Sequence, residues 1–384
     1  MFFHCNRNAL ILLSLLAGAV SAHSAAPQAY KWSVQYLIDN SQPVFGRSQE
    51  VYPRANRALA ISPDGNYLYA GYHQSFNNGA LLNTKNSRMT NSGEVRKIDL
   101  RIADYEDATK AVLQFHQTKA IAVDDRNRVY LADVSAIDVY DADLQKSLLS
   151  IPMEDCNGVA AVREGGDTVL YATEREKGDL HRFLIDTRFG SDGCRATPAG
   201  LGGTGVLHIQ GAQNLRGVAV DGKGRIWMAD TELNRVFRVN ADGSEQVAVE
   251  VGTPLAIGFF DDTAMVTRNT DREIALISPD MVVTGNLSVP WEELELAPYG
   301  NNHDGALCGI AIIPGGKGFF VANEHGQTSN QKSTYGRTDQ NSEVIDGKLY
   351  TDAYQDDNEP ILRAVPVEVQ DVVVGTSPAA SPSP

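Results

Sequence analysis

A short unit that recurs six times along the chain is the sequence feature that most constrains the fold. Each copy begins with a small residue and alternating apolar residues, passes through a polar turn, and ends with a second apolar run. In the clearest copy, Asp221-Gly222-Lys223-Gly224 joins Gly217–Val220 to Arg225–Ala229. Asp/Gly turns between β-branched, aromatic and small residues are typical of antiparallel hairpins. The small residues that open the copies are Ala58, Ala120, Gly158, Gly217, Ala256 and Gly309.

The spacing of these copies predicts how the hairpins are arranged. The shorter intervals are close to the roughly 40–45 residues of a four-stranded propeller blade, and the longer ones leave room for insertions. We therefore predict an all-β fold over residues 23–370, a six-bladed β-propeller with four-stranded antiparallel blades around a central channel. Radial closure protects the strand edges. The early stretch Lys31–Ile38 is expected to complete the last blade and close the ring.

The two ends of the chain differ from the repeat region. Arg7, the apolar stretch Ala9–Val20 and the small residues Val20-Ser21-Ala22 predict a secretory signal peptide over residues 1–22. The Ser/Pro-rich residues 371–384 are expected to form an unstructured tail. We find no further apolar segment long enough for a membrane span. The sequence therefore predicts a secreted or periplasmic protein.

The charge balance excludes some partners. Thirty-three Lys and Arg residues face 48 Asp and Glu residues, for a net charge of −15. A surface this acidic repels a phosphate backbone or an anionic membrane. The partners that this charge balance leaves open are a small-molecule or saccharide ligand and a protein.

Cysteine usage fits an exported protein in part. Cys5 leaves with the predicted signal peptide, so three cysteines remain. The simplest interpretation is one disulfide and one free thiol. We predict the pair Cys156–Cys194, because both lie in or beside one repeat, with Cys308 free. Closing that loop would stabilise the fold by about 3–4 kcal/mol in the chain-entropy model.

The fourth unit resembles a known repeat. Gly217–Asp221 followed by Trp227–Val236 is similar to the blade signature of the NHL-repeat propellers, and the second unit shares part of it. More distantly, the chain is similar to the gluconolactonase/paraoxonase class of six-bladed propellers. That resemblance implies a divalent metal in the axial channel and hydrolysis of lactones or esters. Asn157-Gly158 stands where that class has one Asn ligand, whereas its first-blade Glu and its later Asp ligand have no counterpart in this sequence.

The phase of the repeat places certain residues on one face of the ring. The innermost strand of a blade begins at one face and the second strand returns to it, so the residues just before the inner strands gather there. We call these the rim positions: Arg57, Lys119, Asn157, Arg216, Leu255 and Cys308. Three cations in an acidic protein predict an electropositive funnel for an anionic ligand. The alternative is ordinary loop residues paired with local carboxylates. The predicted substrate-binding residues are Arg57, Lys119, Asn157, Arg216 and, from the loop after a second strand, Arg268.

The loops that follow the second strands carry acid–base groups on the same face. An adjacent acid and imidazole, Glu324-His325, suit proton transfer or metal ligation, and His73 and His303 fall in loops of that face. The catalytic candidates are His73, His303, Glu324 and His325, and the candidate ligands of a divalent metal, Ca²⁺ or Zn²⁺, are His73, His303 and His325. The alternative is that these are surface histidines. Glu174-Arg175 occupies the equivalent loop of the third unit, and Asp230, in that of the fourth, is expected to be structural.

Three function classes remain. The first is an exported enzyme, a lactone or ester hydrolase or a lyase, acting on a small anionic or saccharide-like substrate. The second is a non-catalytic binding scaffold of the NHL type, and the third is an electron-transfer or cofactor-bearing subunit. The absence of a Cys-x-x-Cys-His motif ranks the third last, and no Gly-x-Ser-x-Gly elbow or phosphate loop is found. Polar insertions at residues 74–92 and 326–347, expected to form a lid over the channel, favour the enzyme slightly.

Overall fold

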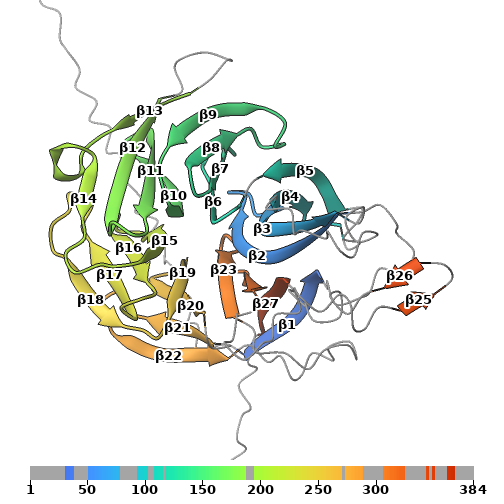
Figure 1. The fold of residues 1–384 in the computed structure, drawn as a ribbon. Helices are drawn as coiled ribbons and strands as arrows, with labels where there is room; N and C mark the ends of the chain where they lie inside the picture. The colour runs from blue at the N-terminus through green and yellow to red at the C-terminus, as the bar shows by residue number, and fades with distance from the viewer. Residues whose placement is uncertain are drawn as a thin grey trace, which may run out of the picture.

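Antiparallel sheets arranged in a ring make up the described part of the chain (Figure 1). The computed structural model describes residues 31–38, 51–77, 93–102, 108–115, 117–186, 194–269, 273–288, 306–324, 343–345, 348–350 and 361–367. The predicted signal peptide (1–22) and tail (371–384) lie outside these residues. Within them, no helix is long and apolar enough to cross a membrane.

The sheets follow one another along the chain, each with its strands in sequence order from the centre outward, except at the closure. The first has β2 (Val51–Ile61), β3 (Tyr67–Asn77), β4 (Gly93–Asp99) and β5 (Thr109–Phe115). The second has β6 (Ala120–Val123), β7 (Val129–Ala132), β8 (Ala136–Tyr140) and β9 (Ser147–Pro152). The third has β10 (Cys156–Glu164), β11 (Asp167–Glu174), β12 (Asp179–Asp186), β13 (Arg195–Pro198) and β14 (Val206–His208), with the 3-10 helix η3 (Leu201–Gly203) between the last two.

The remaining sheets complete the ring. The fourth has β15 (Leu215–Val220), β16 (Ile226–Asp230), β17 (Arg235–Val239) and β18 (Val247–Glu250). The fifth has β19 (Pro254–Phe260), β20 (Thr263–Arg268), β21 (Glu273–Ile277) and β22 (Val283–Ser288). The sheet at the closure has β23 (Ala306–Ile312), β24 (Phe319–Glu324), β27 (Ile361–Val367) and β1 (Lys31–Ile38). A separate hairpin joins β25 (Glu343–Ile345) and β26 (Lys348–Tyr350).

The propeller arrangement and its closure agree with the sequence. The inner strands contact one another in the order β2, β6, β10, β15, β19 and β23, and β23 returns to β2. Strand β1 pairs antiparallel with β27, from Lys31 opposite Val367 to Ile38 opposite Ile361. The prediction that Lys31–Ile38 closes the ring is therefore confirmed.

The strand count of the blades differs from the prediction. Among the described residues, five ring sheets have four strands, whereas the sheet that begins with β10 has five, so a ring of six four-stranded blades is wrong in that detail. Both β13 and β14 pair with β12, β13 along Phe183–Asp186 and β14 along Asp179–His181. Gly200, Gly203 and Gly205 have φ of 90°, 79° and 84°, which allows the chain to turn back between these two strands.

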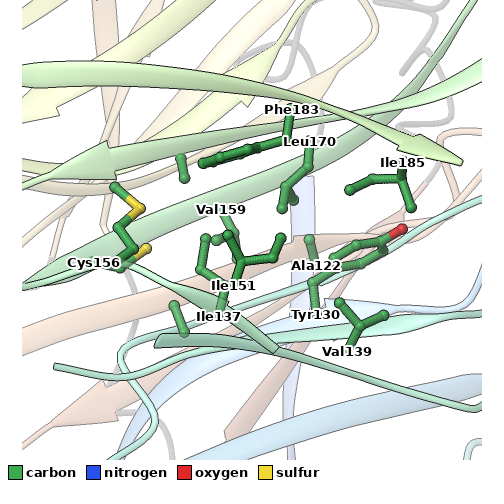
Figure 2. Close-up of a cluster of buried hydrophobic side chains, with 13 residues drawn as sticks. Ala122, Tyr130, Ile137, Val139, Ile151, Cys156, Val159, Leu170, Phe183 and Ile185 are labelled. Atoms are coloured by element: carbon green, nitrogen blue, oxygen red, sulfur yellow. The ribbon is translucent and has the colours of Figure 1, made fainter. Parts of the chain in front are cut away.

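Apolar side chains fill the space between neighbouring sheets. Tyr130 and Ile137 of the second sheet pack against Val159, Leu170 and Phe183 of the third (Figure 2). Figure 2 shows these side chains pointing toward one another between the two sheets. The alternating apolar residues of each repeat therefore provide the core that fixes one blade against the next.

The Asp of the hairpin turn stabilises the end of the blade opposite the rim positions. The Asp221 carboxylate accepts hydrogen bonds from the Lys223 and Arg225 amides (both 2.9 Å), Arg225 Nε (2.7 Å) and Trp227 Nε1 (3.0 Å). Asp124 repeats this arrangement with the corresponding residues of the second sheet, Arg126, Arg128 and Tyr130. Burial opposes ionisation of Asp221, but these donors outweigh it and the pKa of Asp221 lies below its usual range.

Candidate functional site

The rim positions are the places where the inner strands leave regular pairing. Asn56 pairs with Tyr72 and Ala58 with Gly71, so Arg57 falls outside the ladder. The pairing is interrupted in the same way around the other rim residues, at Cys156/Gly158, Leu215/Val218, Pro254/Ile257 and Leu307/Ile310. Lys119 directly precedes β6, and its N–H donates to the Ala132 carbonyl at 2.8 Å. Because the six rim residues lie at the same end of equivalent inner strands, the repeat phase inferred from the sequence is confirmed. The roles of these residues stay predictions.

At two rim positions the neighbouring sheet requires that a glycine follow. A Cβ on Gly158 would lie 2.6 Å from Thr173 Oγ1 and closer still to the Arg216 carbonyl oxygen. Gly217 approaches the Leu255 carbonyl in the same way. Thr173 Oγ1 donates to the Arg216 carbonyl at 2.5 Å. The backbone of Arg216 is thus held by the preceding sheet, and that of Leu255 is packed closely against the preceding sheet.

Four polar residues surround Arg216 at this face, and we call the five together the rim network. Arg216 donates from Nε to Asn214 Oδ1 (2.9 Å) and from Nη1 to Asn157 Oδ1 (3.4 Å). Asn157 Nδ2 donates in turn to Asp155 Oδ1 (3.1 Å), whose other oxygen accepts from Arg175 Nε (2.9 Å). Asn157 is buried. The network therefore joins two guanidinium groups of different sheets through amides and one carboxylate.

Two other predicted positions have local roles. Arg268 Nη1 contacts Glu273 Oε2 at 2.7 Å and its Nε donates to the Gly252 carbonyl, which fits the alternative of pairing with a local carboxylate. Asp230 is fully buried and accepts hydrogen bonds from the amides of Gln213, Asn214 and Leu233. Its expected structural role is confirmed.

The predicted catalytic and histidine metal residues lie largely outside the described structure. His303 and His325 are not among the described residues, and neither are the side chains of Arg57, His73 and Glu324. The backbone of His73 lies in β3, which continues to Asn77. Residues 74–77 are therefore strand, where the sequence suggested the start of an inserted loop. Proton transfer and Ca²⁺ or Zn²⁺ binding at these residues stay predictions.

A second cluster of side chains, Glu174, Asp179 and His181, was not predicted from the sequence. Glu174 ends β11, Asp179 begins β12, and His181 follows two residues later on the same side of the strand. Their potential ligand atoms lie within 4.8 Å of one another. The repeat phase of the sequence places Glu174 on the functional face, whereas His181, which lies in the third strand of its sheet, is not among the predicted site residues. The available signal was the Asp-x-His spacing directly after a turn that begins with Glu.

The predicted disulfide is wrong, since Cys156 and Cys194 are both free thiols. They lie at opposite ends of the third sheet: Cys156 pairs with Glu174, at the β11 end next to Asp179, and Cys194 precedes Arg195, which pairs with Asp186. Eight strand residues separate these ends, roughly 23 Å at about 3.3 Å per residue. A disulfide requires Cα atoms within about 7 Å. Burial raises the pKa of both thiols.

Comparison with known proteins finds similarity only among solved structures. No family model and no curated protein match the chain. A chain of a nidogen/laminin complex is 13% identical, with a TM-score of 0.46 over 67% of this chain and 84% of that one. Virginiamycin B lyase from Staphylococcus aureus with quinupristin is 10% identical, with a TM-score of 0.44 over 88% of this chain and 100% of that one. A streptogramin B lyase is 9% identical, with a TM-score of 0.45 over 88% and 98%. At such values these similarities do not bear on the chemistry of the site.

Proposed function

We propose that this exported propeller binds a small anionic, saccharide-like ligand at the face where the rim positions gather. The observation that carries the proposal is the placement of Arg216 at a bulge, with its guanidinium oriented by Asn157 and Asn214. Arg57, Lys119 and Asn157 occupy the equivalent positions of the three preceding sheets. Four consecutive inner strands therefore present polar or cationic residues to one region.

The chemistry of Arg216 suits a carboxylate. Amide oxygens orient the plane of a guanidinium without adding charge, and a planar fork can form two parallel hydrogen bonds to a carboxylate. Because the side chain is already ordered by two hydrogen bonds, less conformational entropy is lost when a ligand binds. In a protein of net charge −15, local cations at the centre of the ring also attract an anion selectively.

The proposal extends to a reaction. A lactone or ester hydrolase or a lyase needs a group that moves protons near the bound anion, and His73, His303, Glu324 and His325 are assigned that role, with a divalent cation as candidate cofactor. In this proposal the ring is a six-bladed NHL-like propeller whose third blade carries the fifth strand. The second candidate is a non-catalytic scaffold. It is favoured by the pairing of Arg268 with Glu273, because a predicted substrate-binding arginine forms an ion pair within its own sheet instead.

Calorimetric titration with matched sugars tests the binding proposal. We expect the protein to bind galacturonate or gluconate more tightly than galactose or glucose at low ionic strength. Arg216→Ala should weaken binding of the acids by about 10- to 100-fold, the equivalent of losing one charge-assisted hydrogen-bonded contact, and affect the neutral sugars little. The control is Arg163→Ala, an exposed arginine at the far end of β10 that pairs with Asp125. Equal losses for acidic and neutral sugars, or no preference for acids in the native protein, would refute the proposal.

Turnover is tested separately with a panel of sugar lactones, aryl esters and uronate oligosaccharides. A hydrolase or lyase should lose kcat in His303→Ala or His325→Ala while retaining acid binding. Acid binding without turnover of any member of the panel would favour the scaffold.

A further inference from the structure

We propose that Glu174, Asp179 and His181, the rim-side cluster of β11 and β12, form a divalent transition-metal site of the Zn²⁺ class. This site uses none of the residues of the rim network. It also differs from the histidine site considered in the sequence, and it does not depend on the proposed function.

Strand register brings the three ligands together. Glu174 and Asp179 are paired residues at the two sides of a tight turn, and His181 follows on the same side of β12. His181 Nε2 and Glu174 Oε2 are 3.0 Å apart, and all three ligand atoms lie within 4.8 Å. Donor atoms around a tetrahedral zinc ion are about 3.3–3.6 Å apart, so small side-chain rotations close the site.

The surroundings hold this geometry in advance. The His181 ring stacks on Phe183 with centroids 6.1 Å apart and an angle of 11°, and Phe183 belongs to the core cluster of Figure 2. Gly178, in the turn, has φ of 66°, and a Cβ there would lie 3.1 Å from the Ala212 carbonyl oxygen. The chain between Glu174 and Asp179 therefore has little freedom to open.

A second imidazole supports one of the carboxylates. His208 lies opposite Asp179 in the β12–β14 pairing, and its Nδ1 is 2.9 Å from Asp179 Oδ1. Metal-ligating carboxylates are usually oriented by such an outer partner. The additional strand β14, which departs from the four-stranded pattern, is the element that supplies it. His208 is thus a positioning residue in this proposal.

A lysine pairs with one carboxylate oxygen of the cluster. Lys177 Nζ contacts Glu174 Oε1 at 2.6 Å, and the Lys177 side chain is 60% exposed whereas that of Glu174 is 7% exposed. The ammonium can move into solvent when a divalent cation replaces it. Lys177 is therefore a competitor for the site, and its removal should favour metal binding.

The mixture of donors selects the metal class. One imidazole nitrogen and two carboxylates suit Zn²⁺ and related ions, which accept nitrogen and oxygen ligands in low coordination number. Ca²⁺ requires six to eight oxygen ligands, more than this cluster supplies. A metal held by three protein ligands also retains an open position for water.

Titration of chelator-treated full-length protein with ZnCl₂, compared with CaCl₂, tests the site. We expect Zn²⁺ binding that depends on this cluster and much weaker Ca²⁺ binding. His181→Ala and Glu174→Gln should each lower Zn²⁺ affinity by about 100-fold or more, and His208→Ala by about 10-fold, in line with the loss of a ligand and of an outer partner. Lys177→Met should raise the affinity. Glu176→Gln, in the same turn but paired with Arg175, is the matched control and should leave it unchanged.

If Zn²⁺ binds elsewhere in the protein, the affinities of these variants will differ from those expected. If His181→Ala leaves Zn²⁺ affinity unchanged, or if Lys177→Met fails to raise it, the site is refuted and Glu174, Lys177 and His181 form only an ion-pair network. If a ligand variant fails to fold, Lys177→Met still tests the site. The Lys177 side chain is exposed, so its replacement should not disturb folding. Circular dichroism of each variant shows whether it has folded.

Discussion

Replacing Gly158 by alanine tests how one sheet holds the rim residue of the next. The added Cβ would lie 2.6 Å from Thr173 Oγ1, 3.0 Å from the Val218 amide nitrogen, and nearer still to the Arg216 carbonyl oxygen. Ordinary van der Waals contact begins at about 3.4 Å. Two of these three neighbours are backbone atoms of β15, which cannot rotate away. The inner strand of the fourth sheet must therefore retreat.

The expected loss follows from overpacking and one hydrogen bond. Forcing an extra carbon into a packed interior costs about 1–3 kcal/mol. Displacing the Arg216 carbonyl weakens its 2.5 Å hydrogen bond from Thr173, worth about 0.5–1.5 kcal/mol. Alanine also lowers the conformational entropy of the unfolded chain relative to glycine, which stabilises the folded state by about 0.4–1 kcal/mol. Gly158→Ala should therefore lower the free energy of unfolding by about 2 kcal/mol, the sum of the midpoints of these contributions.

Urea denaturation of Gly158→Ala and Gly222→Ala provides the comparison. Gly222 has no positive φ, and a Cβ there would meet nothing within 4 Å. We expect its alanine variant to be as stable as the native protein or slightly more stable. The Gly158 variant should also bind galacturonate more weakly, because the Arg216 backbone moves. Equal unfolding free energies for the two variants would refute the reasoning.

Three further predictions concern stability and accessibility. Asp221→Asn should lower the free energy of unfolding at pH 7 by about 1–3 kcal/mol through weakened hydrogen bonds. Because the pKa of Asp221 is lowered in the folded state, its contribution is present above the ordinary Asp value of about 3.9 and is lost as pH falls through the folded value. The difference in unfolding free energy between native protein and variant, measured by urea denaturation, should therefore be smaller at pH 3 than at pH 7. In the native protein, a thiol reagent should modify half-buried Cys194 before buried Cys156, and a reductant should leave the melting temperature unchanged; a lowered melting temperature would indicate a disulfide. Deleting residues 23–38 removes β1, so hydrogen exchange at Ile361–Val367 should accelerate, whereas unchanged exchange would show that β1 does not protect the closure.

The sequence predicted the parts of the fold that depend on local chemistry. Each hairpin combines a polar turn with alternating apolar residues, so its strands and its phase can be recognised without knowledge of the neighbours. The rim positions followed from that phase, and the interruption of pairing at Asn157 and Arg216 agrees with it. The closing strand was recognised because an early stretch, Lys31–Ile38, can complete the last blade of a ring, and its pairing with β27 agrees with this.

Features that depend on contacts between strands distant in sequence were predicted poorly. Cys156 and Cys194 were paired because they share a repeat, but proximity along the chain does not place residues at the same end of a blade. The return of β14 to β12 was not predicted, because it depends on several glycines between β13 and β14 that adopt positive φ. His181 was missed for the same reason, since its relation to Glu174 arises only from strand register.

The rim network shows why a propeller face is difficult to derive one repeat at a time. Arg216 belongs to the fourth sheet, but its carbonyl is held by Thr173 and its guanidinium contacts Asn157, both of the third. Arg175 reaches the same network through Asp155, and it directly follows Glu174 of the proposed metal site. Glu174 is the last residue of β11, whereas Arg175 is the first residue of the turn that follows it. One strand end therefore contributes to two different sites, and a substitution there should be judged by its effect on both.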